Sequence, residues 1–253
     1  MKEQLYTIPL NDAFAAQDEC PFCFIEQKLE QDLLDFTLGS GSSYMESDIR
    51  DKTDKEGFCR YHFLKMYQYG NTLGNAWILK THYQQINHTF ASEVKKFKPA
   101  KLSFMDRFKH TTEVNNTMTA WIYKERQSCY ICKQYEDTYA RYLDTFFYMY
   151  KKDAAFSKKL EESKGFCLVH FGDLCQSAVE KLPQKQHDEF FTTIFALMEA
   201  NLKRIEEDVS WMVEKFDYRN KDADWKNSRD AIQRGMQKLK GGYPAAPIYQ
   251  QKK

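Results

Sequence analysis

The strings GFCRYHF (residues 57–63) and GFCLVHF (residues 165–171) decide the fold of this chain. Each carries a Cys-x-x-His pair, Cys59/His62 in the first and Cys167/His170 in the second. A Cys-x-x-Cys pair precedes each: Cys59 follows Cys20 by 39 positions (59 − 20), and Cys167 follows Cys129 by 38 (167 − 129). Two copies of one pattern, with intervals that differ by a single residue, indicate an internal duplication.

The duplicated pattern supplies the donors of a metal site. Zinc binds thiolates and imidazole tetrahedrally, and three cysteines with one histidine form a closed set that leaves no position for water or substrate. We therefore expect two structural zinc ions, one within each copy, with each ligand pair at or just before the start of a helix. The expected ligands are Cys20, Cys23, Cys59 and His62 in the first copy, and Cys129, Cys132, Cys167 and His170 in the second.

Alternatives to zinc are open for these cysteines. An iron–sulfur cluster accepts the same residue types and is the main metal alternative. A thioredoxin-like centre at CPFC (residues 20–23) needs a βαβ context, and a c-type haem needs a histidine where Phe24 and Lys133 stand. Cysteines buried without a ligand are the non-metal alternative. The seventh, Cys175, is interpreted as a small buried side chain.

The rest of the sequence predicts an all-α fold. The chain has only 10 Gly and 6 Pro, and apolar residues recur at helical spacing along most of it. We predict two metal-stapled helical hairpins packed as a bundle, followed by a C-terminal helix that starts at Asn227 or Ser228 and ends at Gly241. One long helix is expected from Phe58 toward Phe90, after a polar connector at residues 44–56. Pro99 marks the boundary between a first module (residues 1–98) and a second (residues 99–253), which we expect to form one compact body.

Charge and targeting signals narrow the range of partners. The 37 basic and 36 acidic residues balance, which disfavours nucleic acid as a partner. We find no signal peptide, no apolar stretch long enough for a membrane span, no phosphate-binding glycine loop and no HExxH motif. A cytoplasmic protein is expected, in which cysteines serve as metal ligands rather than as disulfides.

Several stretches together resemble a known family. These are IPLNDAF…ECPFC, MESDIR, GFCRYHF…LGNAWILKTH, GFCLVHF and KFDYRN…NSRDAIQR, which extend from Ile8 to about Gly241. The chain resembles a family of uncharacterised bacterial proteins, found largely in anaerobic clostridia, that is classed as a domain of unknown function. The resemblance supports the helical fold and the metal sites, and it implies no activity.

The sequence favours a binding or scaffold protein for an unidentified protein or small-molecule ligand, and it gives no clear sign of an enzyme. The candidate ligand site is residues 217–234, which we call the 217–234 segment. A polar loop that leads directly into the start of a helix is suited to binding a small anion. The candidates are Asp217, Tyr218, Arg219, Trp225, Asn227, Arg229, Asp230 and Arg234. Packing of Trp225 among paired charges is the structural alternative for this segment.

Two other functions are open. One is an enzyme with a cleft between the repeats, gated by the 217–234 segment, with structural zincs and acid–base groups among Glu46, Asp48, Arg50 and Asp230. The other is a redox- or metal-responsive switch in which oxidation of the cysteine pairs releases zinc. Converging titratable groups in a pocket would favour the enzyme, and metal loss under oxidant would favour the switch.

Overall fold

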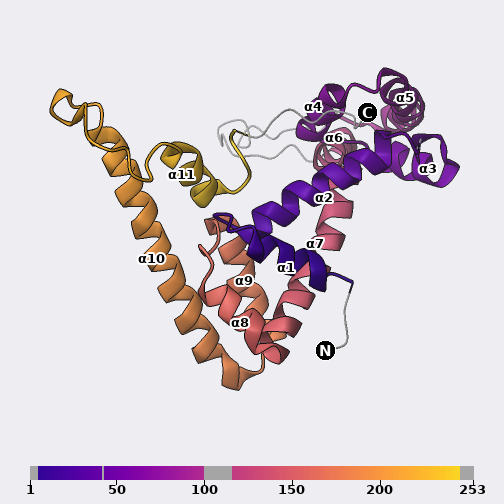
Figure 1. Cartoon of the computed structure of the whole chain (residues 1–253). Helices are drawn as coiled ribbons and strands as arrows, with labels where there is room; N and C mark the ends of the chain where they lie inside the picture. Colours follow the sequence, from indigo (N-terminus) through magenta and orange to yellow (C-terminus); the bar gives the residue numbers. More distant parts are fainter. Residues whose placement is uncertain (1–4, 42, 100–115, 246–253) are drawn as a thin grey trace, which may run out of the picture. The chain divides into compact units, whose positions relative to one another are not determined.

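The computed structural model describes residues 5–41, 43–99 and 116–245, and it confirms the all-α prediction for these ranges (Figure 1). They contain eleven α-helices and no strand. The helices are α1 (Thr7–Ala15), α2 (Pro21–Leu38), α3 (Ser47–Glu56), α4 (Arg60–Tyr69), α5 (Thr72–Lys96), α6 (Thr117–Gln127), α7 (Tyr130–Lys152), α8 (Ala154–Glu161), α9 (Leu168–Lys181), α10 (His187–Glu214) and α11 (Ala231–Lys240). Within these ranges, no helix has both the length and the apolar character needed to cross a bilayer.

The helices form two compact units. The first unit contains the chain up to Glu30 and again from Tyr135 through α11. The second unit is the segment between them, Gln31–Gln134. The boundary expected between residues 98 and 99 lies within this second unit. Helices α2 and α7 each contribute residues to both units.

The first unit has an aromatic core. Rings from α1, α2, α7, α8 and α10 meet there, with Phe146 on α7 contacting Phe14, Phe22, Phe156 and Phe190 at centroid separations of 5.6–6.5 Å. Each of these side chains is at most 2% exposed. Full burial of one such ring contributes about 1.5–3 kcal/mol, so this unit has substantial stability of its own.

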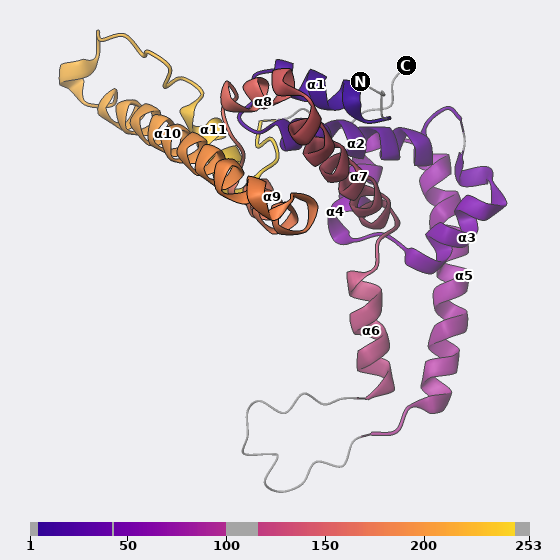
Figure 2. The same cartoon turned by 90° about the horizontal axis from the view of Figure 1, so that it is seen from below.

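The second unit has a smaller core. Leu34, Leu38, Phe58, Met66 and Ile78 are buried there together with residues at the start of α7. Helix α3 packs on α5, and α6 lies beside the C-terminal part of α5 (Figure 2). None of the α6 residues is buried, so this helix contributes little to the core.

Three local expectations about the helices are wrong. The predicted helix from Phe58 toward Phe90 is broken, because Gly70 adopts φ +87° as the left-handed cap of α4 and Asn71 caps the start of α5. The polar connector at residues 44–56 contains helix α3, whose Ile49 is buried. Helix α11 starts after Asp230 rather than at Asn227 or Ser228, although Gly241 ends it as expected.

Candidate metal centres

The structure gathers the eight predicted ligands into two clusters, but it exchanges the expected pairing. The Cys20 cluster contains Cys20, Cys23, Cys167 and His170, and the Cys59 cluster contains Cys59, His62, Cys129 and Cys132. The Cys-x-x-Cys pair of one repeat therefore meets the Cys-x-x-His pair of the other. The expectation that each repeat completes its own site is wrong. Each cluster nevertheless lies within a single unit, the Cys20 cluster in the first and the Cys59 cluster in the second.

Every ligand pair lies where a helix begins. Pro21 starts α2 directly after Cys20, and Tyr130 starts α7 directly after Cys129. Cys59 and Cys167 occupy the cap positions of α4 and α9. The amide of His170 donates to the Cys167 sulfur at 3.4 Å. Helix starts place free amide groups and positive potential around sulfur, which favours the thiolate form.

The spacing of the donor atoms fits one tetrahedral ion in each cluster. Tetrahedral zinc separates two sulfurs by about 3.8 Å, and a sulfur from a nitrogen by about 3.6 Å. The Cys23 and Cys167 sulfurs are 3.7 Å apart, and His170 Nδ1 lies 3.2–3.5 Å from the three sulfurs of its cluster. In the other cluster His62 Nδ1 lies 3.3–3.4 Å from its three sulfurs. Both sets can therefore hold a single metal ion through Nδ1 and three sulfurs.

The glycine and the first phenylalanine shared by the strings at residues 57–63 and 165–171 each have a structural role. Gly57 and Gly165 adopt φ +58° and +72°, which side chains other than glycine rarely accept. A Cβ at Gly57 would also lie 2.8 Å from the ring of His82. The phenylalanine that follows each glycine is buried, Phe58 in the core of the second unit and Phe166 in that of the first. In each copy, the glycine conformation and the buried phenylalanine fix the backbone directly before the cysteine and histidine that belong to the cluster.

The sulfurs of each cluster influence one another's ionisation. The neighbouring sulfurs of Cys167 and Cys20, together with burial, raise the pKa of Cys23 far above that of a free thiol. Burial acts to raise the pKa of Cys129, but its hydrogen bonds with His62 and backbone amides lower it to about 6. Burial and the nearby charge of Cys129 raise the pKa of Cys132. Three thiolates at this spacing can coexist only around a cation, so the donor chemistry fits a metal ion.

The two clusters differ in how well they are covered. All four ligands of the Cys20 cluster are buried, whereas Cys59 and Cys132 are partly exposed. Gly241, at the end of α11, lies over the Cys20 cluster: a Cβ there would be 3.4 Å from the Cys167 sulfur and 3.5 Å from that of Cys23. The C-terminal helix therefore closes one cluster.

We expect this difference in cover to make the Cys59 cluster lose its metal first. A chelator reaches a partly exposed thiolate site more readily, so metal should leave in two phases of about one equivalent each. Mass spectrometry after alkylation during the first phase should find label on Cys59, Cys129 and Cys132. Simultaneous labelling of Cys20 and Cys23 at the same rate would contradict this expectation.

The residues of the 217–234 segment do not form one site. Asp217 pairs with Arg219 in an exposed turn at 2.6 Å, and Tyr218 points into solvent, 85% exposed. Trp225 is half-buried and lies under Lys215 and Arg229, with the Lys215 ammonium 5.2 Å from the indole ring. These contacts agree with the packing alternative for Trp225.

The Lys215 ammonium organises the loop itself. It donates to the carbonyls of Asn220, Lys221 and Ala223 at 2.6–2.9 Å. Three acceptors on one buried ammonium hold residues 220–223 in place, which explains why this polar stretch has a defined shape.

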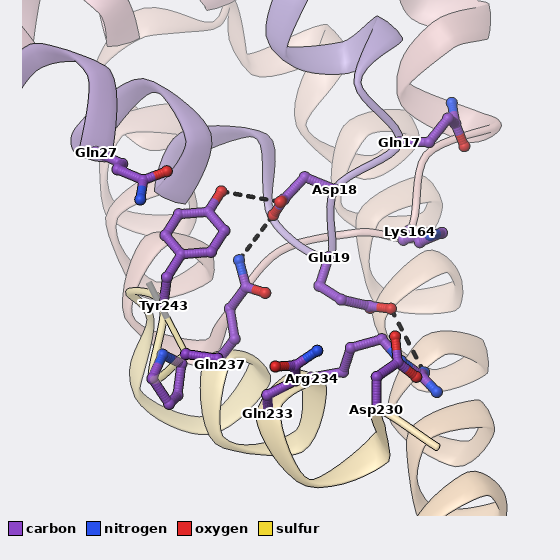
Figure 3. A pocket seen from close by; sticks show the side chains of 12 residues that line it. Gln17, Asp18, Glu19, Gln27, Lys164, Asp230, Gln233, Arg234, Gln237 and Tyr243 are labelled. Atoms are coloured by element: carbon purple, nitrogen blue, oxygen red, sulfur yellow. Dashed lines mark hydrogen bonds and ion pairs between the residues drawn. The ribbon is translucent and has the colours of Figure 1, made fainter. Parts of the chain in front are cut away.

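The other end of the segment belongs to a polar cavity of about 390 Å³ in the first unit (Figure 3). Asp230 and Arg234 line this cavity together with residues that the sequence pattern did not single out. We call it the Glu19 cavity; its walls are Gln17, Asp18, Glu19, Gln27, Lys164, Asp230, Gln233, Arg234, Gln237, Tyr243, Pro244 and Ala245.

Asp18 joins three parts of the cavity wall. Its carboxylate accepts hydrogen bonds from the Cys20 amide at 2.9 Å, from Gln237 at 2.7 Å and from the Tyr243 hydroxyl at 2.9 Å. Cys20 is the first residue of a metal-ligand pair. The hydrogen bonds of Asp18 therefore connect the wall of the cavity directly to the start of the Cys20 cluster. Sequence reasoning misses this wall; the acidic pair directly before Cys20 is the signal that could have indicated it.

Comparison with protein-family profiles matches residues 1–246 to a family of unknown function, DUF6062. No curated protein and no solved structure matches the chain. The match covers both clusters and the whole described fold, in agreement with the resemblance read from the two cysteine–histidine frames. The chain therefore belongs to DUF6062, a family of unknown function.

Proposed function

We propose that this protein is a zinc-stapled helical binding protein, with one structural zinc in each cluster. The observation that carries this proposal is that each cluster offers four protein donors at tetrahedral spacing, three sulfurs and one Nδ1. Four protein ligands fill the coordination sphere of zinc, which is typical of structural rather than catalytic sites. All eight donor residues lie at helix starts, where a bound ion would join two helices.

Zinc is preferred over an iron–sulfur cluster because of the size of the sites. The donor atoms of each cluster lie within 4.8 Å of one another, which suits a single ion. A multi-iron cluster places several iron and sulfide atoms between its ligands and separates them further. A cytoplasmic location is part of the proposal, since a reducing compartment keeps six cysteines available as thiolate ligands.

The binding role is supported by the Glu19 cavity. Pockets that bind small molecules combine a concave shape with a few convergent polar groups. This cavity gathers carboxylates, amides and a phenol from α2, from the loop before Cys20, and from α11 with the residues on either side of it. Its ligand would sit beside the Cys20 cluster, so we expect the zinc there to hold the wall of the cavity rather than to contact the ligand.

Metal content tests this proposal directly. Protein purified without chelator should contain two zinc ions per chain by elemental analysis and should be colourless. Loading should require reduced cysteines, since a disulfide removes two ligands at once. Iron with a brown chromophore, or a single metal ion per chain, would contradict the assignment.

A further inference from the structure

The two clusters contain equivalent pairs of sulfur atoms. The duplicated pattern makes Cys59 equivalent to Cys167, and Cys132 equivalent to Cys23. In each cluster the two sulfurs of this pair come from different repeats. They are 3.9 Å apart between Cys59 and Cys132, and 3.7 Å apart between Cys23 and Cys167. The distance between the sulfurs therefore does not distinguish the two pairs.

Exposure to solvent does distinguish them. Cys23 and Cys167 are at most 1% exposed, and the third sulfur of the other cluster, that of Cys129, is 4% exposed. Cys59 and Cys132 are both partly exposed. Oxidation of cysteine depends on its thiolate character and on access for the oxidant. Among the six cysteines of the clusters, the two that a small oxidant can reach are thus the two whose sulfurs lie 3.9 Å apart.

The segments that carry these two sulfurs are also joined by contacts that do not involve sulfur. The Tyr130 amide donates to the Gly57 carbonyl at 2.9 Å, and the rings of Tyr130 and Phe58 lie 6.3 Å apart in an edge-to-face contact. Lys133 pairs with Glu56 at 2.6 Å. Each contact joins the segment that leads into α4 to the first turn of α7, and none of them needs a metal ion. The two sulfurs should therefore remain close together when the metal leaves.

We propose that the Cys59 cluster is a peroxide-sensitive zinc site, in which Cys59 and Cys132 form a disulfide and the metal ion is released. A disulfide removes two of the four donors at once, and Cys129 and His62 are too few to hold a structural zinc ion. The Cys20 cluster keeps its ion because its sulfurs are buried. The inference rests on the proposed zinc assignment and adds to it that one of the two zinc sites responds to oxidants.

Hydrogen peroxide accounts for both electrons of this reaction. One of the two thiolates attacks a peroxide oxygen, so that an S–O bond forms, the O–O bond breaks and hydroxide leaves. The second thiolate attacks the sulfenic sulfur, so that the S–S bond forms, the S–O bond breaks and a second hydroxide leaves. The two sulfurs lose two electrons in total, and the peroxide is reduced to two hydroxide ions. A thiol reductant reverses the disulfide, after which the site can bind zinc again.

Peroxide treatment of the zinc-loaded full chain tests the inference. After treatment and gel filtration we expect about one zinc ion per chain, because only one set of four donors remains intact. Peptide mapping should find a disulfide between Cys59 and Cys132. The first zinc ion should leave about tenfold faster than the second or more, since the buried sulfurs react only when the first unit opens locally. Reduction followed by added zinc should restore the original content.

Two controls separate this reaction from other losses of metal. An untreated sample carried through the same gel filtration should keep both zinc ions, which excludes simple dissociation from the more exposed cluster. The variant Cys175→Ser removes the partly exposed cysteine that belongs to neither cluster. It should release zinc at the rate of the unaltered chain and form the same disulfide.

Several results would overturn the inference. These are retention of both zinc ions under peroxide, loss of both at the same rate, or a disulfide between Cys23 and Cys167 formed as fast as that between Cys59 and Cys132. Oxidation of the exposed pair to sulfinic or sulfonic acid without a disulfide would also contradict it, as would the absence of zinc release in Cys175→Ser. All of these leave the zinc content before treatment unchanged. A chain with fewer than two zinc ions before treatment would instead contradict the proposed function itself.

Discussion

Replacing Cys167 by serine is expected to empty the Cys20 cluster and to leave the Cys59 cluster loaded. Cys167 supplies one of the three sulfurs that surround His170 Nδ1 at 3.2–3.5 Å. Structural zinc contributes about 10–16 kcal/mol in small finger peptides, against about 5–15 kcal/mol for the stability of a typical domain. Even partial loss of this contribution should lower the melting temperature of the first unit visibly. Its aromatic core should keep the unit from unfolding completely.

Alkylation followed by mass spectrometry shows which cysteines are no longer bound to a metal ion. In Cys167→Ser we expect Cys20 and Cys23 to become reactive, while Cys129 and Cys132 remain protected. The matched variant Cys59→Ser should reverse this pattern. Cys175→Ser is the control, because Cys175 belongs to neither cluster and its loss should leave two zinc ions bound. If Cys167→Ser exposed Cys129 and Cys132 instead, each repeat would hold its own zinc and the exchanged pairing would be refuted.

The exchange of ligands could not be predicted from spacing. Two intervening residues place Cys20 and Cys23, or Cys167 and His170, on the first turn of a helix, and this part of the prediction depends only on local geometry. Which pair meets which depends on how helices far apart in the chain pack together. Both pairings use the same eight residues and satisfy zinc equally well, so the pattern alone carries no information that separates them.

The helical class was predictable because the signal is long and repeated. Helix α10 carries Phe190, Ile194, Met198 and Ile205 on its buried face, at the spacing that the sequence shows. The break at Gly70 was missed for a physical reason. Helical spacing continues across it, and only the left-handed conformation of one glycine separates α4 from α5.

Helix α11 reverses the usual relation between polarity and burial. Its apolar residues Ile232, Met236 and Leu239 are 53–56% exposed, whereas Lys238 is 1% exposed. Periodicity predicts that the apolar side faces inward. The polar side faces inward here because Glu19 and two backbone carbonyls offer acceptors to Lys238. Since these acceptors lie more than 70 positions away in the chain, the sequence of the helix gives no sign of them.

Substitution of Lys238 by methionine is expected to destabilise the first unit strongly. Methionine has a similar length and is apolar, so it removes the ammonium while filling most of its space. The carbonyls of Glu19 and Lys164 would lose their donor, and the Glu19 carboxylate would keep Arg204 at 2.5 Å and Arg234 at 3.7 Å as its cations. Breaking a buried ion pair by removing one partner costs about 3–5 kcal/mol. For a unit of this size the melting temperature should fall by roughly 6–20 °C.

The control lies two residues further along the same helix. Lys240 is exposed, so Lys240→Met should change the free energy of unfolding by less than about 0.5 kcal/mol. A second readout separates this result from a general loss of packing. Lys238 holds the Glu19 carbonyl, and Glu19 directly precedes Cys20, so the start of the Cys20 cluster should loosen in Lys238→Met. Zinc should then leave the Cys20 cluster faster, with the Cys59 cluster unchanged. An unaltered melting temperature and release rate would mean that the buried charges around Glu19 do not support the metal site, and that Gly241 and the hydrogen bonds of Asp18 hold it without them.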